Sequence, residues 1–398
     1  MANAEVKDYQ FVDVPKGKLE NGQEIPLLGI GTWQAETASA YGFCHITDAW
    51  LSLQPGVVGK AIENALRLGY RHLDCAEMYG NQVEIGHALQ KVFKEGKIKR
   101  EDIWITSKLH NNSHDPERVP EACKETLRDL QIEQLDLYLM HFPVSGPVGA
   151  PRPDPPFQVT WGAMEKLVEA GLTKNIGVSN FSVKKVEALR GTANIQPAVQ
   201  QIEGHPYFRN NYNIHYCKTH GMHVTAYSPL GTPGSGSITH RAKNVPVLLQ
   251  DPLVKSIADK HNKHPAQVLV RWGIQRGTSV IPKATSVAHM KSNLEAANWE
   301  LPPEDFKLLN FLGYQKRMVD GGAWFITPEG PYKTLTDLWD YEEETVFSVP
   351  LPGMFSNGDS RSDEQHRVST QHDIHTFTEK LGNTHKIILP KNLNNSRN

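Results

Sequence analysis

The feature that most constrains this chain is a regular alternation of short β-rich runs with longer amphipathic stretches, between about residue 25 and residue 300. In the longer stretches apolar residues recur at three- and four-residue spacings, which is the period of a helix with one buried face. Strands that alternate with helices predict a parallel sheet covered by helices. Eight such units match a closed (β/α)8 TIM barrel of the α/β class, which is the fold we expect, although a doubly wound open sheet has similar local patterns.

Residue ranges can be given to these elements and to a hairpin that precedes them. The expected strands are 27–30, 72–75, 103–107, 135–140, 175–178, 198–202, 223–227 and 279–282. The expected helices include 57–68, 118–130, 162–170, 183–189, 211–220, 253–261 and 265–275. Asn21-Gly22 stands between two β-like flanks, and Asn-Gly is a typical pair for a tight hairpin turn. Because this N-terminal β-hairpin comes before the first strand, it is in a position to cover the N-terminal face of the barrel.

Composition and charge exclude several classes of protein. The formal net charge is −2, so the chain lacks the basic excess that nucleic acids and anionic membranes attract. No run approaches the roughly 18 apolar residues of a membrane span, and the first residues lack the apolar centre of a signal peptide. The four cysteines form no C-x-x-C pair and stand at no metal-ligand spacing with histidine. We therefore expect a cytoplasmic protein with no metal site that binds neither nucleic acid nor membrane.

Motifs for nucleotide binding and hydrolysis are missing from the sequence. Gly29-Ile-Gly31 begins like a dinucleotide-binding loop, but the third glycine of that motif is absent and a simple turn explains the pair. There is no P-loop motif, no H-E-x-x-H and no G-x-S-x-G. The sequence thus offers no anchor for Ser–His–Asp hydrolysis.

Charged and polar residues stand at the ends of three consecutive expected strands. Asp74 ends the second strand and is followed by Tyr79, Lys108 ends the third, and His141 ends the fourth. The carboxyl ends of parallel barrel strands converge on one face, where catalytic groups lie. Any one of these residues alone is explained by a structural ion pair, but four complementary groups together predict a catalytic site.

The chemistry of the four groups is coherent. A tyrosine phenol has a pKa of about 10, and a nearby ammonium group stabilises the phenolate, so we expect Lys108 to lower the pKa of Tyr79. Asp74 would hold that ammonium group, and a neutral His141 would donate a hydrogen bond to a carbonyl oxygen. Together they would protonate the oxygen of a carbonyl group that accepts hydride. The hydride must come from a cofactor, because no side chain supplies one.

These residues lie in segments that resemble the aldo-keto reductase family. Residues 69–79 (GYRHLDCAEMY) resemble its first signature, residues 164–181 (ending KNIGVSNF) its second, and residues 279–283 (SVIPK) the start of its third. Residues 330–339 (GPYKTLTDLW) are similar to the plant aldose/aldehyde reductase branch. The resemblance extends over about residues 19–343 and implies a (β/α)8 barrel that binds NADPH across its C-terminal mouth.

The resemblance also implies a role for individual residues. Asp74, Tyr79, Lys108 and His141 would form the catalytic tetrad, with Tyr79 as the proton donor. The cofactor would be bound by Thr32, Trp33, Asp74, Ser179, Asn180, Gln201, Tyr227, Ser228, Leu230, Lys283, Ala284, Thr285, Ser286, His289 and Asn293. The substrate would contact Trp33, Met78, His141 and Phe142.

The third signature departs from the family pattern in a way that affects the cofactor. The family has serine at the position of Ala284 and, at the position of His289, an arginine that binds the 2′-phosphate. Histidine is mostly neutral at pH 7, so an arginine–phosphate pair is lost or weakened. We expect weaker NADPH binding than is usual in the family and less discrimination against NADH.

Two segments fall outside the family pattern. Residues 37–54 form an insertion in the first βα loop, which is either a lid carrying Tyr41, Phe43 and Trp50 or an insertion without a selected role. We favour the second, because the flanks join cleanly when the segment is removed. Residues 344–398 form a polar tail that we expect to be disordered, so that residues 1–343 make up one barrel domain.

The sequence therefore predicts an NADPH-dependent reductase of aldehydes and ketones. The alternative is a cofactor-binding barrel with little activity that acts as a regulatory or interaction subunit. The partner would be a small-molecule carbonyl substrate, which the sequence does not specify, and the family-level expectation is a monomer.

Overall fold

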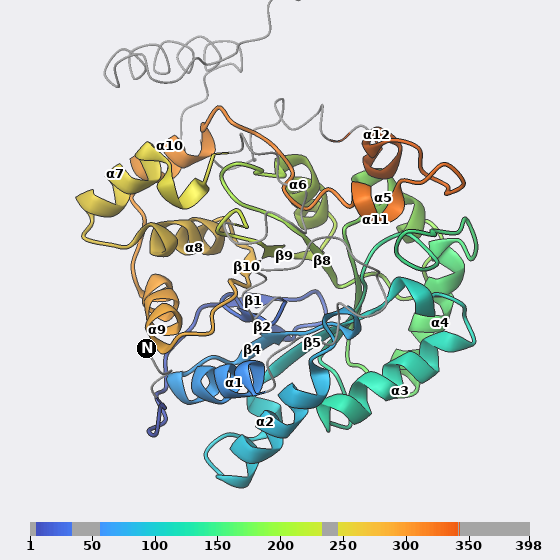
Figure 1. Ribbon diagram of the computed structural model, residues 1–398, viewed down its shortest axis with the longest axis horizontal. Helices are drawn as coiled ribbons and strands as arrows, with labels where there is room; N and C mark the ends of the chain where they lie inside the picture. The colour runs from blue at the N-terminus through green and yellow to red at the C-terminus, as the bar shows by residue number, and fades with distance from the viewer. Residues whose placement is uncertain (1–4, 34–55, 233–245, 341, 343–398) are drawn as a thin grey trace, which may run out of the picture. The chain divides into compact units, whose positions relative to one another are not determined.

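The computed structural model describes residues 5–33, 56–232, 246–340 and 342, and Figure 1 shows helices arranged around a central set of strands. Among these residues eight parallel strands form one sheet in the order β10-β9-β8-β7-β6-β5-β4-β3. The strands are β3 (Ile30–Gly31), β4 (His72–Asp74), β5 (Trp104–Leu109), β6 (Leu137–Met140), β7 (Ile176–Ser179), β8 (Val199–Glu203), β9 (His223–Tyr227) and β10 (Ser279–Val280). Each strand pairs with the next one in the sequence, as β/α alternation predicts.

The first and last strand segments meet and close the sheet. Leu28 forms a parallel bridge with Val280, and Gly31 forms another with Lys283. A Cβ atom on Gly31 would lie 2.8 Å from the carbonyl oxygen of Ile281, so this close approach requires glycine. The TIM barrel prediction is confirmed, and the alternative of an open sheet is wrong.

Helices follow the strands in the expected order. They are α1 (Val57–Leu68), α2 (Gln82–Lys94), α3 (Arg118–Leu130), α4 (Phe157–Glu169), α5 (Val183–Arg190), α6 (Asn211–Thr219), α7 (Pro252–Lys260), α8 (Pro265–Gln275), α9 (Val287–Glu295), α10 (Pro303–Asn310), α11 (Gly322–Phe325) and α12 (Leu335–Trp339). Short 3-10 helices are η2 (Glu77–Tyr79), η3 (Arg100–Asp102), η4 (Asn111–Ser113), η5 (Leu248–Gln250) and η6 (Ala296–Asn298). The start of α4 differs from the predicted residue 162. Its first turns bury Thr160, whose hydroxyl donates to the carbonyl oxygen of His114, so the apolar period is broken there.

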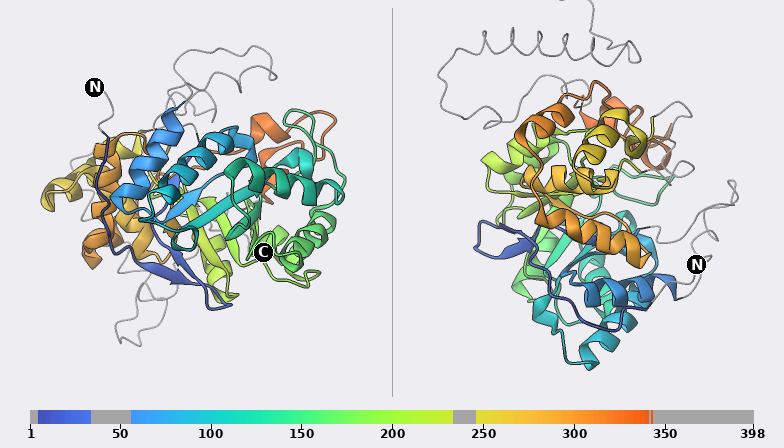
Figure 2. Two further views of the ribbon diagram at one scale, coloured as in Figure 1. Left: turned by 90° about the horizontal axis from the view of Figure 1, so that it is seen from below. Right: turned by 90° about the vertical axis from the view of Figure 1, so that its left-hand side faces the viewer.

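The predicted N-terminal hairpin is confirmed. Strands β1 (Lys16–Lys18) and β2 (Glu24–Pro26) pair antiparallel, and Gly22 takes a φ of 84° in the turn between them. Leu19 and Ile25 are buried in one apolar cluster with the first residues of three barrel strands, which are Trp104, Leu137 and Val199, and with Leu139. Both views of Figure 2 place the hairpin at the end of the barrel opposite α11 and α12. The hairpin thus covers the N-terminal face and leaves the other face to the polar strand ends.

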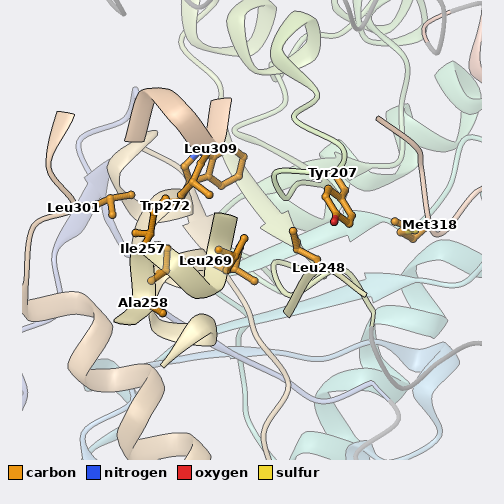
Figure 3. Close-up of a cluster of buried hydrophobic side chains, with 11 residues drawn as sticks. Tyr207, Leu248, Ile257, Ala258, Leu269, Trp272, Leu301, Leu309 and Met318 are labelled. Atoms are coloured by element: carbon orange, nitrogen blue, oxygen red, sulfur yellow. The ribbon is translucent and has the colours of Figure 1, made fainter. Parts of the chain in front are cut away.

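Side chains from α7, α8 and α10 meet in an apolar cluster, which Figure 3 shows. Its buried members are Tyr207, Leu248, Val254, Ile257, Ala258, Val268, Leu269, Trp272, Leu301, Leu309 and Met318. Tyr207 belongs to the loop after β8, and Met318 belongs to the chain that follows α10. The cluster therefore fastens the chain after α10 to the loop after β8.

Several predictions concern residues that the structure does not describe. The contacts of the chain divide it into Met1–Val349 and Pro350–Asn398, and the second unit lies wholly outside the described residues. The insertion at 37–54 and the tail at 344–398 also lie outside them. Within the described part of the chain, no helix combines the length and the apolar character needed to cross a membrane.

Candidate active site

Three neighbouring strands bring the predicted tetrad to the C-terminal mouth of the barrel. Asp74 is the last residue of β4, and Tyr79 ends the 3-10 helix η2 that follows it. Lys108 lies near the end of β5, and His141 directly follows β6. All four residues thus lie where parallel strands end, as their positions in the sequence predict.

The ammonium group of Lys108 connects the tetrad. Its Nζ atom donates to Oδ1 of Asp74 at 2.6 Å, to the carbonyl oxygen of Cys75 at 2.8 Å and to the hydroxyl of Tyr79 at 3.3 Å. An ammonium group has three N–H donors, so these contacts satisfy all of them. The side chain of Lys108 is fully buried, and Asp74 supplies the opposite charge that a buried cation requires.

The carboxylate of Asp74 is fixed from the far side of the barrel. Gln201, on β8, donates from Nε2 to Oδ2 of Asp74 at 2.7 Å. The backbone carbonyl of Asp74 accepts from the hydroxyl of Thr32 at 2.8 Å. Each carboxylate oxygen therefore has a donor of its own, so the orientation of the Asp74–Lys108 pair is fixed.

Tyr79 titrates differently from the prediction. Part of its side chain is exposed at the mouth, but the dense protein around the phenol disfavours a phenolate. This burial raises the pKa of Tyr79 well above 10, and the negative charge of Asp74 raises it further. The pKa of Tyr79 is therefore raised and not lowered as expected, because burial of the phenol is the largest influence on it. At neutral pH Tyr79 is therefore a neutral phenol that carries a proton.

His141 is neutral, as predicted. Burial lowers the pKa of His141 well below 6.5, and the positive charge of Lys108 lowers it further. The imidazole lies edge-on to the ring of Tyr79, with ring centroids 5.8 Å apart and planes at 76°. A neutral imidazole beside the phenol can donate one hydrogen bond without adding a charge to the site.

Amide and hydroxyl groups adjoin the tetrad, on β7 and β9. Asn180 donates from Nδ2 to the carbonyl oxygen of His141 at 3.0 Å and to Oγ of Ser179 at 3.1 Å. Its Oδ1 atom accepts from the hydroxyl of Tyr227 at 2.7 Å. With Gln201, which already binds Asp74, these are uncharged donors and acceptors. Such a set fits the carboxamide of a nicotinamide ring.

The family is decided by comparison with known proteins. A family model described as the aldo/keto reductase family matches residues 28–312, more than half of the chain. The chain belongs to the aldo/keto reductase family. It is thus an NAD(P)H-dependent oxidoreductase that acts on carbonyl groups, and the predicted resemblance is confirmed.

The relatives of this aldo/keto reductase include plant, bacterial and animal proteins. It is 40% identical over 331 residues to aldo-keto reductase family 4 member C11 of Arabidopsis thaliana, covering 82% of this chain and 97% of the relative. It is 42% identical over 332 residues to an aldo/keto reductase of Synechocystis, covering 81% and 95%.

Solved structures agree with the fold. An aldose reductase from Schistosoma japonicum superimposes with a TM-score of 0.67 at 37% identity, covering 80% of this chain and 99% of the other. A Bombyx mori aldo-keto reductase in complex with NADP superimposes with a TM-score of 0.71 at 29% identity, covering 81% and 100%.

The predicted phosphate-binding residues of this aldo/keto reductase gather at the start of α9. Ser286 caps that helix by accepting from the backbone N–H of His289 at 3.2 Å. Lys283 and His289 are exposed, Thr285 and Ser286 are partly exposed, and Ala284 is buried. The first turn of α9 holds no acidic residue, so the positive end of the helix and Lys283 fit an anionic phosphate.

The remaining predicted cofactor residues differ from one another in exposure and in their contacts. Ser228 follows β9 with a φ of 51° and is partly exposed, whereas Leu230 packs against the cluster of Figure 3. Asn293 is buried on α9. The hydroxyl of the buried Tyr70 donates to the carbonyl oxygen of Met290 on the same helix at 3.1 Å, which holds α9 against the barrel.

An aromatic wall that includes Trp33 and Phe142 borders the tetrad. Trp33 stacks on Tyr79 with ring centroids 6.4 Å apart, and Phe142 stacks on His141 at 5.3 Å. Met78 precedes Tyr79 in η2 and is partly exposed. The structure thus brings Trp33, Met78 and Phe142 close to Tyr79 and His141, and their contact with the substrate stays a prediction.

Two further aromatic residues pack against Phe142 and were not predicted, namely the partly exposed Trp324 and the fully buried Phe325. Phe325 lies 4.8 Å and Trp324 lies 6.0 Å from Phe142, measured between ring centroids. Both belong to α11, more than 180 residues after Phe142 in the chain. Their signal in the sequence is a pair of adjacent aromatic residues within a glycine-rich stretch, which has no periodicity to draw attention to it.

Proposed function

We propose that this aldo/keto reductase reduces aldehydes and ketones to alcohols with NADPH, and that Tyr79 donates the proton. The observation that carries the proposal is the contact between the fully buried Lys108 ammonium group and the Tyr79 hydroxyl at 3.3 Å, with Asp74 fixing the ammonium group from the other side. A cation held in this position is suited to stabilise charge that develops on the phenol oxygen.

The residues divide the proton chemistry among them. When bound, NADPH supplies the hydride that the carbonyl carbon accepts. As the carbonyl oxygen becomes basic, the O–H bond of Tyr79 breaks and the proton moves to that oxygen, which completes the alcohol. Lys108 stabilises the phenolate that remains, which counteracts the raised pKa of Tyr79. His141 donates a hydrogen bond that orients the carbonyl oxygen toward Tyr79.

The use of NADPH is supported by both ends of the predicted cofactor site. Ser179, Asn180 and Gln201 form a set of neutral amide and hydroxyl groups beside the tetrad. Lys283 and the start of α9 form a positive region suited to phosphate. The similar protein from Bombyx mori is a complex with NADP. With histidine at position 289, we propose that NADH is also accepted.

The wider assignment is part of the same proposal. Residues 1–343 form the catalytic domain, residues 344–398 form a tail outside it, and the protein works as a cytoplasmic monomer on small carbonyl compounds. The three described cysteines, Cys75, Cys123 and Cys217, are free and buried, which suits a reducing compartment.

The test compares NADPH oxidation by the wild type and by Tyr79→Phe with a reactive aldehyde. Removing the general acid is expected to lower kcat by about 10²- to 10⁴-fold while NADPH still binds. Tyr138→Phe serves as the control, because it makes the same change at a buried tyrosine on β6 that lies outside the tetrad and the predicted binding residues. Turnover that survives in Tyr79→Phe would refute the assignment. A wild type that binds NADPH and reduces no aldehyde would instead support a regulatory or interaction subunit.

A further inference from the structure

The chain between α10 and α12 lies along the loop that follows β8. We call residues 315–325 the C-terminal strap. The backbone N–H of Lys316 donates to the carbonyl oxygen of Tyr207 at 2.7 Å. The side chain of Gln315 donates to the carbonyl oxygen of Pro206 at 2.8 Å. The strap is therefore fastened to a loop that begins at the C-terminal end of a barrel strand.

Glu203, the last residue of β8, binds the strap through both of its carboxylate oxygens. Oε1 accepts from the backbone N–H of Met318, and Oε2 accepts from the backbone N–H of Val319, each at 2.8 Å. Nε2 of His205 lies 2.7 Å from Oε1. Because a carboxylate can only accept, this nitrogen is the donor. The side chains of Glu203 and His205 are fully buried, and neither contributes to the tetrad.

This arrangement needs two acceptors side by side. Two successive backbone N–H groups converge on one side chain, and each meets an oxygen that has no hydrogen. A glutamine at this position would still accept one of them, but its NH2 group would face the other N–H. Changing Glu203 to Gln therefore leaves a buried donor of the strap unsatisfied without changing the size of the side chain.

The bound part of the strap lies next to the aromatic wall in the sequence. The side chain of Met318 packs with Tyr207 in the cluster of Figure 3. The guanidinium group of Arg317 lies 4.4 Å from the ring centre of Phe208. Trp324 follows Val319 by five positions and stands against Phe142. Because only four residues separate Val319 from Trp324, a displacement of the backbone at Val319 is expected to move Trp324.

We propose that Glu203 is a positioning residue of this reductase, which sets where the partly exposed Trp324 stands against Phe142. It thereby selects for carbonyl substrates that carry a flat apolar substituent. This inference rests on the proposed function, since it concerns the same substrate side. Gln201 and Glu203 are two residues apart and so point to the same face of β8. Strand β8 therefore binds Asp74 through the side chain of Gln201 and binds the strap through the side chain of Glu203.

The first experiment measures the strap without using activity. Hydrogen–deuterium exchange is followed by mass spectrometry in the wild-type full-length protein and in Glu203→Gln. Peptides that cover residues 315–326 are expected to exchange at least about tenfold faster in the variant, because one of the two buried N–H groups of the strap loses its acceptor. Peptides from β4 and β5 are expected to exchange as in the wild type.

The second experiment measures the choice of substrate. In the presence of NADPH, kcat/KM is determined for 4-nitrobenzaldehyde and for propanal. In Glu203→Gln the value for the aromatic aldehyde is expected to fall by about ten- to a hundredfold, mainly through KM, since small misplacements of binding groups have effects of this size. The value for propanal is expected to change less than about twofold, because the tetrad is untouched.

Two further variants separate positioning from general loss of stability. Asp305→Asn is the matched control, because Asp305 is also a buried carboxylate that holds a histidine, with His261 Nε2 2.6 Å from Oδ2. It is expected to lower the melting temperature without changing the ratio of the two substrates. In a Trp324→Ala background, Glu203→Gln is expected to have no further effect on that ratio, since the wall it positions is already removed.

The outcomes distinguish this inference from the proposed function. A wild type that reduces neither aldehyde overturns the proposed function and, with it, the role in substrate choice. An active Glu203→Gln enzyme with unchanged exchange in the strap overturns the positioning role. Equal losses for both aldehydes, or the same change of ratio in Asp305→Asn, overturn it as well. Should Glu203→Gln fold poorly, His205→Gln keeps both strap bonds and is expected to show a smaller shift in the same direction.

Discussion

The buried ion pair between Lys108 and Asp74 predicts a specific pattern of stability. The Lys108 side chain is 0% exposed and that of Asp74 is 2% exposed, with 2.6 Å between Nζ and Oδ1. Removing one member leaves the other charge in a place that water does not reach. Asp74→Asn and Lys108→Met are each expected to lower the free energy of unfolding by about 3–5 kcal/mol.

The double variant separates the pair from its surroundings. Asp74→Asn combined with Lys108→Met leaves no unpaired charge, and Gln201 can still donate to the asparagine oxygen. We therefore expect the double variant to be more stable than the sum of the single changes predicts, with a coupling energy of about 2 kcal/mol or more. All three variants are expected to lose activity, and the measurement of stability does not depend on turnover.

The free energies of unfolding of the three variants are measured by urea unfolding, followed by circular dichroism and by tryptophan fluorescence. The two transitions must coincide for this measurement. With an m-value of about 3 kcal/mol/M, a loss of about 3 kcal/mol lowers the midpoint by about 1 M. Ser107→Ala is the control, because it changes a neighbouring buried side chain on β5 and leaves both charges in place. Single variants within about 1 kcal/mol of the wild type, or strictly additive losses, would refute the reasoning.

Two further predictions follow from the cofactor site and from the end of the described chain. His289→Arg is expected to lower the Kd for NADPH several-fold and to leave that for NADH unchanged, because only NADPH carries the 2′-phosphate; a titration that shows no gain contradicts this. Burial raises the pKa of Glu342 from its ordinary value of 4.5 to about 7 in the folded protein. The folded state therefore binds this proton more tightly than the unfolded state does, and the resulting stabilisation is complete below pH 4.5. It is lost as the pH rises through about 7. Between pH 5 and pH 8 the melting temperature of the wild type is therefore expected to fall relative to that of Glu342→Gln, and parallel curves would exclude this role.

Sequence alone was sufficient where a local pattern determines the structure. The helices α1, α3 and α8 and the strand β9 begin and end at the predicted residues, because apolar periodicity or β-branched runs define them. The tetrad could also be predicted. Parallel strands must bring their carboxyl ends to one face, so Asp74, Lys108 and His141 had to lie together once the barrel was assumed.

The features that were missed depend on the path of the chain in space. The contact of Trp324 and Phe325 with Phe142 arises because the strap returns to the mouth of the barrel, and no periodicity encodes that return. The pKa of Tyr79 was predicted in the wrong direction for a related reason. Its partner Lys108 is visible in the sequence, but the extent of burial, which is the larger influence, is a property of the assembled site.

The site therefore separates two tasks that a carbonyl reductase must combine. The charges to which we assign the proton chemistry are buried on β4 and β5, where three partners saturate Lys108 and two donors hold the Asp74 carboxylate. The wall that we expect to contact the substrate comes in part from a strap, which is held by hydrogen bonds from its backbone to the Glu203 side chain. Its contact with the tetrad runs through Phe142, which stacks on His141. Substitutions in the strap can therefore change which carbonyl compounds are bound while the proton-donating geometry stays the same, and the two kinetic parameters kcat and KM should respond to different parts of the chain.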